Sequence, residues 1–201
     1  MTIKNIVFDV GNVLVRYDPS FIIAKSFPGH PDHESLVEGI FKHQTWLDLN
    51  LGLVTESQAL QEYQSRLNLE IELLQQMALH TKESLVPLPG SFELLRQLSM
   101  HYDMYALTDN THDIMAYLQD RYDFWPIFKG IVVSAVVGHL KPSKEIYHHL
   151  LSTYDLVPEE TLFLDDMPRN IEGAKQMGMQ AILFESAEQA IIELKKLGIK
   201  L

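Results

Sequence analysis

Short runs of apolar, often β-branched residues recur along the chain and alternate with longer segments in which apolar positions follow a helical period. The runs lie at residues 3–10, 104–108, 131–133, 161–164 and 180–184. In the second half of the chain the intervening segments have helix length, and their expected starts are marked by Thr111, Pro142 and Asn170. Strands that alternate with helices predict an α/β fold built on a parallel sheet.

The segment 16–86 differs, because it has no comparable apolar run and contains several helical stripes. Thr55 and Gln58 have the spacing of a capping box, which predicts a helix start at that point. We therefore expect a helical cap at residues 16–86, inserted between two parts of an α/β core at residues 1–15 and 87–201.

The boundaries of this insertion suggest a hinge. Residues 86–90 read Val-Pro-Leu-Pro-Gly, and a proline-rich segment makes a stiff connection. We expect the cap to pivot near Val15 and Val86 and to close over a substrate. The aromatic and leucine positions of the insertion fit a bundle core, except for Trp46, for which we expect a substrate contact.

Composition and charge exclude several classes of protein. The 201 residues are 46% hydrophobic and 21% charged, as in an ordinary globular protein, and the absence of cysteine excludes disulfides and thiolate zinc sites. With a net charge of −11 and no cluster of Lys and Arg, nucleic acid is not an expected partner. Asp9 interrupts the first apolar run too early for a signal peptide, and no run approaches the roughly 18 residues that cross a membrane. We expect a cytoplasmic protein without a membrane partner, and the sequence leaves its oligomeric state open.

Candidate functional groups stand where the apolar runs end. In chain order they are Asp9, Thr108-Asp109-Asn110, Lys141 and Asp165-Asp166. Each has a structural explanation when taken singly, because Asp, Thr and Asn commonly cap the helix that follows a strand and lysine is commonly solvated. The carboxyl ends of parallel strands meet at one edge of the sheet, however, so the four groups together predict a single site.

In this order the motifs resemble those of the haloacid dehalogenase superfamily. The matching stretches are residues 8–14 (Phe-Asp-Val-Gly-Asn-Val-Leu), 107–110 (Leu-Thr-Asp-Asn), 141–142 (Lys-Pro) and 163–166 (Phe-Leu-Asp-Asp). The resemblance spans nearly the whole chain and implies a Rossmann-like core with an inserted helical-bundle cap. The first and last motifs are most similar to the branch that contains alpha-D-glucose-1-phosphate phosphatase.

The resemblance implies a phosphatase that hydrolyses a small phosphorylated metabolite, with a sugar phosphate favoured, through an aspartyl-phosphate intermediate. Asp9 is the expected nucleophile, because an ordinary aspartate has a pKa of about 3.9 and is ionised at neutral pH. Thr108 and Lys141 are the other expected catalytic residues. The residues expected to bind substrate or phosphate are Thr108, Asp109, Asn110, Lys141, Arg16 and Trp46.

The same chemistry calls for a metal ion. A carboxylate and a phosphate repel one another, and a hard dication with oxygen ligands reduces that repulsion, so we expect Mg²⁺. By the family pattern its ligands are the Asp9 carboxylate, the Gly11 carbonyl and the Asp166 carboxylate, with Asp165 bound directly or through water.

Gly11 departs from the pattern of most phosphatases in the superfamily. Those enzymes carry a second aspartate at this position, two residues after the nucleophile, as general acid and base. General acid–base help is typically worth about 10² to 10⁴ in rate. We expect a good leaving group, or a donor from the cap, to make up part of that loss.

Two other functions stay open. A 2-haloacid dehalogenase-like hydrolase would also use Asp9 and lack the second aspartate, but without a cation Asp165 and Asp166 would repel its carboxylate substrate. A catalytically weak protein that binds a phosphorylated ligand would explain Gly11, yet it would have no need of Asp9 as a nucleophile.

Overall fold

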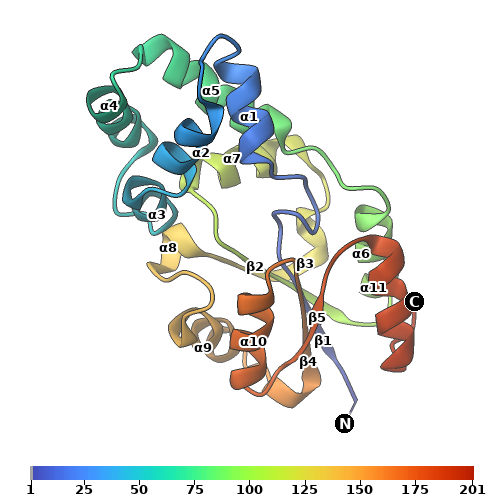
Figure 1. Ribbon diagram of the computed structural model, residues 1–201. Helices are drawn as coiled ribbons and strands as arrows, with labels where there is room; N and C mark the ends of the chain where they lie inside the picture. The colour runs from blue at the N-terminus through green and yellow to red at the C-terminus, as the bar shows by residue number, and fades with distance from the viewer. Residues whose placement is uncertain (1) are drawn as a thin grey trace.

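The chain forms a parallel sheet flanked by helices, with a group of further helices above one end of the sheet (Figure 1). The computed structural model describes residues 2–201. The strands are β1 (Asn5–Phe8), β2 (Asp103–Thr108), β3 (Phe128–Val133), β4 (Thr161–Asp165) and β5 (Gln180–Leu183). The helices of the first half are α1 (Pro19–Ser26), α2 (His33–Phe41), α3 (Gln44–Asn50), α4 (Glu56–Leu67), α5 (Ile71–Ser84) and α6 (Ser91–Ser99). The remaining helices are α7 (His112–Arg121), η1 (Trp125–Ile127), α8 (Ser134–Val137), α9 (Lys144–Thr153), η2 (Pro158–Glu160), α10 (Pro168–Gln176) and α11 (Ala187–Lys196).

The sheet has the strand order β3-β2-β1-β4-β5, and all neighbouring strands are parallel. Phe8, the last residue of β1, lies beside Ala106 of β2 and Leu164 of β4. The chain places β2 and β3 on one side of β1 and then crosses to the other side for β4 and β5. Ligands of such sheets bind beyond the carboxyl end at this reversal of strand order. The prediction of an α/β fold with a parallel sheet is confirmed.

Helices cover both faces of the sheet. Ile6 and Phe8 of β1 pack in one apolar core with residues of α6, α7 and α11. Val7, which points to the opposite face, packs in a second core with residues of α9 and α10. This alternation follows from the two-residue period of a strand and leaves β1 apolar on both faces.

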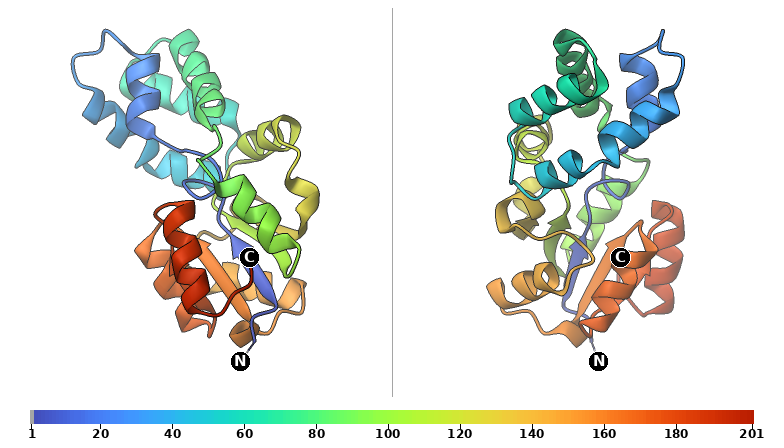
Figure 2. Two further views of the ribbon diagram at one scale, coloured as in Figure 1. Left: turned by 90° about the vertical axis from the view of Figure 1, so that its right-hand side faces the viewer. Right: turned by 60° about the vertical axis from the view of Figure 1, so that its left-hand side comes forward.

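Helices α1 to α5, the cap helices, have an apolar core of their own, which includes Ile22, Ile40, Tyr63 and Leu74. Figure 2 shows them as an upper unit joined to the sheet by a narrow waist. The predicted capping box is present at the start of α4, where Thr55 accepts from the Gln58 amide and the Gln58 side chain accepts from the Thr55 amide. The domain boundaries at residues 15 and 87 stay predictions.

The two segments that join the cap helices to the sheet run side by side and pair with one another. The Arg16 amide donates to the Val86 carbonyl at 2.8 Å, and the Leu88 amide donates to the Leu14 carbonyl at 2.9 Å. Val15 and Pro87 form an antiparallel bridge between these bonds. The proline-rich segment is thus part of a short two-stranded connection.

One expected helix start is wrong. Helix α10 begins at Pro168, and Asn170 lies inside its first turn. Proline fits the first turn because the amide that it lacks has no helical partner there, and the Asn170 side chain has a different role, described below. In residues 2–201 no helix has the length and apolar character needed to cross a membrane.

Candidate active site

A cleft of about 380 Å³ lies between the carboxyl edge of the sheet and the cap helices. From the core it is lined by Asp9, Gly11, Asn12, Asp109, Leu140, Lys141, Asp166, Met167, Arg169 and Asn170. From the connecting segment and the cap helices it is lined by Tyr17, Pro19, Val37, Phe41, Lys42, Trp46, Leu47 and Asn50. The loops after β1, β2, β3 and β4 therefore reach the same cleft, as expected for parallel strands.

Lys141 is the centre of the charged groups in the cleft. Its Nζ atom lies 2.9 Å from Asp9 Oδ1 and 2.7 Å from Asp165 Oδ2, and it donates to the Leu107 carbonyl at 3.2 Å. These contacts use all three donors of the ammonium group. Burial by itself lowers the pKa of Lys141, but the carboxylates of Asp9 and Asp165 outweigh it and raise that pKa above its usual range. Lys141 is therefore a permanent buried cation.

Asp9 follows β1 and is 7% exposed. Its Oδ1 atom accepts from the Val10 amide at 2.7 Å, in addition to the contact with Lys141. Burial, opposed by Lys141 and reinforced by the nearby Asp165, raises the pKa of Asp9 to about 8. A second positive charge beside Asp9 would favour the ionised form that a nucleophile requires.

Asp165 is fully buried, and hydrogen bonds occupy both of its oxygens. Oδ1 accepts from the Met167 amide at 2.8 Å, Oδ2 accepts from Lys141 at 2.7 Å, and the Asn170 amide group donates to both oxygens at 2.9 and 3.0 Å. Asn170 is thus a partner of the carboxylate instead of a helix cap. Asp165 fixes Lys141 in place, and Lys141 in turn fixes Asp9.

Asp166 is the more accessible of the two adjacent carboxylates. Its Oδ2 atom accepts from the Asn12 side chain at 3.3 Å, and burial together with the charge of Asp165 raises its pKa. Ligand atoms of Asp9, Asp165 and Asp166 all lie within 4.8 Å of one another. Carboxylate oxygens at this spacing suit a hard dication such as Mg²⁺, and the Gly11 backbone lines the same cleft. The residues present therefore fit a magnesium ion.

A hydrogen-bond chain links the end of β2 to the cap helices. The Asn110 side chain donates to Thr108 Oγ1 at 3.0 Å, and the Asn110 amide donates to Ser134 Oγ at 3.0 Å. Ser134 Oγ in turn donates to the Asn50 carbonyl at the end of α3, at 2.7 Å. Asp109 faces the other way and accepts from the Lys141 amide at 3.0 Å. Thr108 keeps its own hydroxyl hydrogen available for another acceptor.

Gly52 lies close to the contact between Asn50 of the cap helices and Ser134 of the core, so a substitution there tests that contact. Its φ is +71°, and a Cβ atom there would lie 2.1 Å from the Ala135 carbonyl oxygen. We expect Gly52→Ala to push the α3–α4 loop away from Ser134 and to lower kcat/KM by about tenfold to a hundredfold, because a displacement of about 1 Å at a reactive site has effects of that size. The measurement is phosphate release together with the melting temperature.

Gly138→Ala is the matched control for Gly52→Ala. Gly138 has a similar φ of +73°, but a Cβ atom there meets nothing within 4 Å. Both variants carry the cost of an alanine at positive φ, and only Gly52→Ala carries the clash. Equal kcat/KM values for the two variants would contradict a functional contact between this loop and the core.

Of the two residues near the cap that were expected to contact substrate, Trp46 lines the cleft and Arg16 does not. Trp46 lines the cleft, where its ring is stacked on that of Tyr17 with 6.3 Å between centroids. Arg16 does not line it: its guanidinium carbon lies 4.7 Å from the centroid of the Phe21 ring, and its Nε atom is buried without a hydrogen-bond partner. The basic residues that line the cleft are Lys42, Lys141 and Arg169.

Comparison with known proteins agrees with the family resemblance of the four motifs. A family model described as haloacid dehalogenase-like hydrolase matches residues 47–184. The sesquiterpene phosphatase of Aspergillus oryzae is 26% identical over 98% of this chain and 97% of its own length. The D-ribitol-5-phosphate phosphatase of Bacteroides thetaiotaomicron is 23% identical over 89% of this chain and 90% of its own length.

Solved structures support the same fold. A wild-type haloacid dehalogenase family enzyme of Bacteroides thetaiotaomicron, crystallised with magnesium and inorganic phosphate, aligns with a TM-score of 0.77. The alignment covers 92% of this chain and 95% of that one, at 20% sequence identity.

Proposed function

Because this chain belongs to the haloacid dehalogenase-like hydrolase family, we propose that it is a magnesium-dependent phosphatase of a small phosphorylated metabolite, with Asp9 as the nucleophile. The observation that carries the proposal is the buried Lys141 ammonium held between Asp9 and Asp165, beside the more accessible Asp166. Phosphatase homologues that match nearly the full length support the same activity.

In the proposed reaction an Asp9 carboxylate oxygen attacks phosphorus, and the bond from phosphorus to the leaving oxygen breaks. Lys141 orients Asp9 and supplies a fixed positive charge, while the Thr108 hydroxyl and the Asp109 amide donate to the phosphoryl oxygens as their charge develops. Asp9, the Gly11 carbonyl and Asp166 would hold Mg²⁺, which supplies positive charge between the carboxylates and the phosphate. Water then hydrolyses the aspartyl phosphate, which releases phosphate and restores Asp9.

We assign Asp165 to positioning and not to direct metal binding. Both of its oxygens already accept hydrogen bonds, including the one from Lys141 at 2.7 Å. A ligand role would have to replace one of those bonds. The proposed direct ligands are therefore Asp9, Gly11 and Asp166.

The activity is tested by phosphate release from sugar phosphates, nucleotides and acyl phosphates, with and without Mg²⁺. Release that requires Mg²⁺ and passes through an acid-stable, hydroxylamine-sensitive phosphoprotein supports the proposal. Halide release by metal-stripped protein would support the dehalogenase alternative, and binding without release would support the phospho-ligand binding protein.

The sequence favours a sugar phosphate as substrate, and the D-ribitol-5-phosphate phosphatase among the relatives is in keeping with this. The sesquiterpene phosphatase points to a different kind of leaving group. The residues of the cleft itself bear on this choice.

Gly11→Asp tests the missing general acid. A Cβ atom at Gly11 comes no closer than 4.0 Å, to Tyr17 Cβ, so the site accepts a side chain there. We expect Gly11→Asp to raise kcat for unactivated alkyl phosphates by about tenfold or more, since general acid help is typically worth about 10² to 10⁴. Aryl phosphates, whose leaving groups need little protonation, serve as the control substrates. No gain for alkyl phosphates in a folded variant would count against this account.

Magnesium binding is expected to depend on pH through Asp9. In the folded, metal-free protein the pKa of Asp9 is raised from 3.8 to about 8, so its contribution to stability is present at low pH and is lost as the pH rises through about 8. Mg²⁺ binds the ionised carboxylate and offsets that loss. The rise in melting temperature on adding Mg²⁺ should therefore be larger near pH 8.5 than near pH 6.0. Asp9→Asn should weaken this dependence, and a rise that does not change with pH would contradict it.

A further inference from the structure

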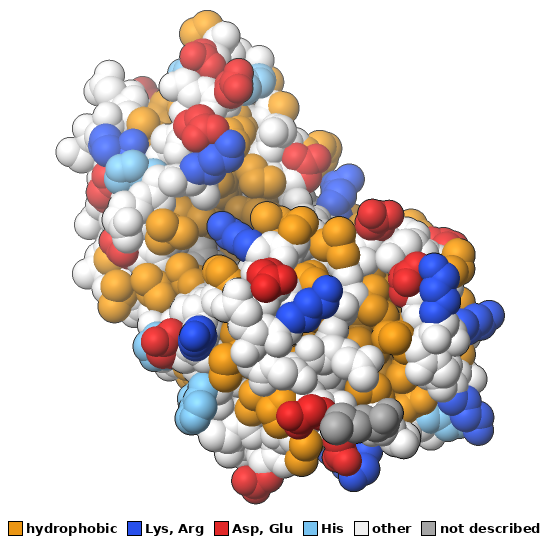
Figure 3. Space-filling model, turned by 60° about the horizontal axis from the view of Figure 1, so that its bottom comes forward, with side chains coloured by type: hydrophobic (Ala, Val, Ile, Leu, Met, Phe, Trp, Pro, Cys, Tyr) orange, Lys and Arg blue, Asp and Glu red, His pale blue; other side chains and the backbone are white. Residues whose placement is uncertain are grey.

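The side of the cleft that faces the phosphate site is largely apolar. Val37, Phe41, Trp46 and Leu47 line it from the cap helices, and Leu140 and Met167 line it from the core. Leu47 and Met167 are 41% and 39% exposed, which is high for large apolar side chains. In the view of Figure 3, hydrophobic side chains gather in a hollow between the upper and lower parts of the molecule, beside basic ones. Exposed apolar surface inside a cleft marks a place for an apolar ligand.

Two polar side chains on this wall already have a partner within the protein. The Asn50 side chain donates to the Trp46 carbonyl at 2.7 Å, and Lys42 pairs with Glu38. The Tyr17 hydroxyl is the exception, because it is buried and has no hydrogen-bond partner among residues 2–201. A site for a sugar or polyol needs side chains that pair with each hydroxyl, because unpaired hydroxyls cost binding energy. The cap wall offers few such groups.

The aromatic residues form a continuous surface above the carboxylates. The ring of Trp46 is nearly parallel to that of Tyr17, at 7° between planes, and Phe41 packs edge-on against it with 4.9 Å between centroids. A Cβ atom at Gly11 would lie 4.0 Å from Tyr17 Cβ, so this surface begins next to the metal-binding loop. A group bonded to the phosphate at Asp9 would leave the site along it.

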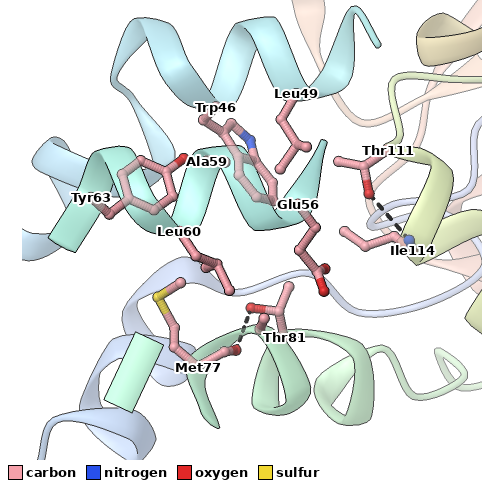
Figure 4. A pocket seen from close by; sticks show the side chains of 11 residues that line it. Trp46, Leu49, Glu56, Ala59, Leu60, Tyr63, Met77, Thr81, Thr111 and Ile114 are labelled. Atoms are coloured by element: carbon pink, nitrogen blue, oxygen red, sulfur yellow. Dashed lines mark hydrogen bonds between the residues drawn. The ribbon is translucent and has the colours of Figure 1, made fainter. Parts of the chain in front are cut away.

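The apolar surface continues behind Trp46. A narrow cavity of about 20 Å³, enough for about one water molecule, lies between α3, α4, α5 and α7. Figure 4 shows that Leu49, Leu60, Tyr63 and Met77 point into this space, with Trp46 as one wall. A recess of about 70 Å³ shares residues with both the cleft and the cavity, and it is lined by Tyr17, Trp46 and Ile114 together with the polar Asn50, Asp109 and Asn110.

The carboxylate and the threonine hydroxyls of the cavity already have partners within the protein. Glu56 pairs with Lys82 at 2.8 Å, and the Thr81 hydroxyl donates to the Met77 carbonyl at 2.8 Å. The Thr111 hydroxyl accepts from the Ile114 amide at 3.1 Å, where it caps α7. None of these groups needs a polar ligand.

We propose that the substrate is the phosphate monoester of an apolar alcohol, and that Trp46 sets the length of the group that fits. The apolar group packs on Tyr17, Phe41 and Trp46 while the phosphate lies at Asp9. Trp46 separates the cleft from the small cavity, and its indole ring occupies the space into which a longer chain would extend. This inference rests on the proposed phosphatase function and replaces both its sugar-phosphate preference and the expectation of a good leaving group, so that the leaving oxygen takes its proton from water.

A matched pair of esters tests the substrate class. n-Hexyl phosphate and a hexitol monophosphate have the same carbon number, and the hydroxyls of the hexitol make it the slightly better leaving group. We expect kcat/KM for the hexyl ester to exceed that for the hexitol ester by about tenfold or more, as apolar pockets discriminate on that scale. Equal rates, or a preference for the hexitol, would overturn the inference. If para-nitrophenyl phosphate is also not hydrolysed, the phosphatase function itself fails.

Trp46→Ala tests the length limit. Removing the indole joins the cleft to the cavity, so kcat/KM for dodecyl phosphate relative to hexyl phosphate should rise by about tenfold. Leu53→Ala is the control, because Leu53 is 69% exposed in the α3–α4 loop and lines neither space. Trp46→Leu keeps more of the packing and should give a smaller rise in the same ratio. An equal loss of rate on both esters in both Trp46 variants would overturn the role of Trp46.

Discussion

We expect Asp9→Asn to lower kcat on every phosphate ester by about four to six orders of magnitude, as the loss of a nucleophile does in other hydrolases. The amide keeps the shape of the side chain and a contact with Lys141, but its oxygen is too weak a nucleophile to form an acyl phosphate. The expected readouts are phosphate release and the disappearance of the labelled phosphoprotein.

Asp113→Asn is the control for Asp9→Asn. Asp113 is an exposed carboxylate in the first turn of α7, outside the cleft. It should keep full activity, so a loss confined to Asp9→Asn would reflect the reaction and not the net charge. Retention of more than about one per cent of wild-type kcat by Asp9→Asn would contradict the nucleophilic role.

Lys141→Met should be the most destabilising single substitution among the charged residues of the cleft. It removes the cation between Asp9 and Asp165, which lies 2.9 and 2.7 Å from their oxygens. Breaking one side of a buried ion pair typically costs about 3 to 5 kcal/mol, because the remaining charge is left unpaired. Turnover should also fall steeply, since Asp9 loses the ammonium group that orients it and the site loses a positive charge beside the phosphate.

Two comparisons separate these effects in Lys141→Met. Lys144→Met removes an exposed lysine from the first turn of α9 and should change neither stability nor rate. Asp165→Asn added to Lys141→Met should restore part of the free energy of unfolding, since one of the unpaired carboxylates is gone, without restoring turnover. If Lys141→Met alone melts like the wild type, the pair with Asp9 is not a stabilising contact.

The elements of the fold that depend on local pattern were predictable. All five apolar runs are strands, and Thr111 and Thr55 cap the helices that their positions predict. These features follow from short-range chemistry, namely the two-residue period of strands and the side-chain bonds of helix starts. The helix start expected at Asn170 is wrong for a related reason: Asn170 has the residue type of a cap, but its amide group satisfies the buried Asp165.

The site was predictable where strand ends determine it and not where side chains meet over long distances. Asp9, Lys141 and Asp165 are brought together because parallel strands end at one edge. Ser134 accepts from the Asn110 amide and donates to the carbonyl of Asn50, which lies 84 positions before Ser134 in the chain. The residues next to Ser134 in the sequence do not predict this contact. The aromatic surface of the cleft also depends on how α2 and α3 pack, which the helical period alone does not determine.

The paired connection at residues 14–16 and 86–88 has a consequence for how such proteins diversify. Because the chain leaves the core and returns to it one hydrogen bond away, with Arg16 and Val86 2.8 Å apart, the intervening helices are topologically equivalent to a long surface loop. Their length and sequence can change, or be exchanged for those of another protein, without moving Asp9 or Lys141. New selectivity can therefore arise on an old reaction centre, and a chimaera joined at these two points is a practical way to transfer it.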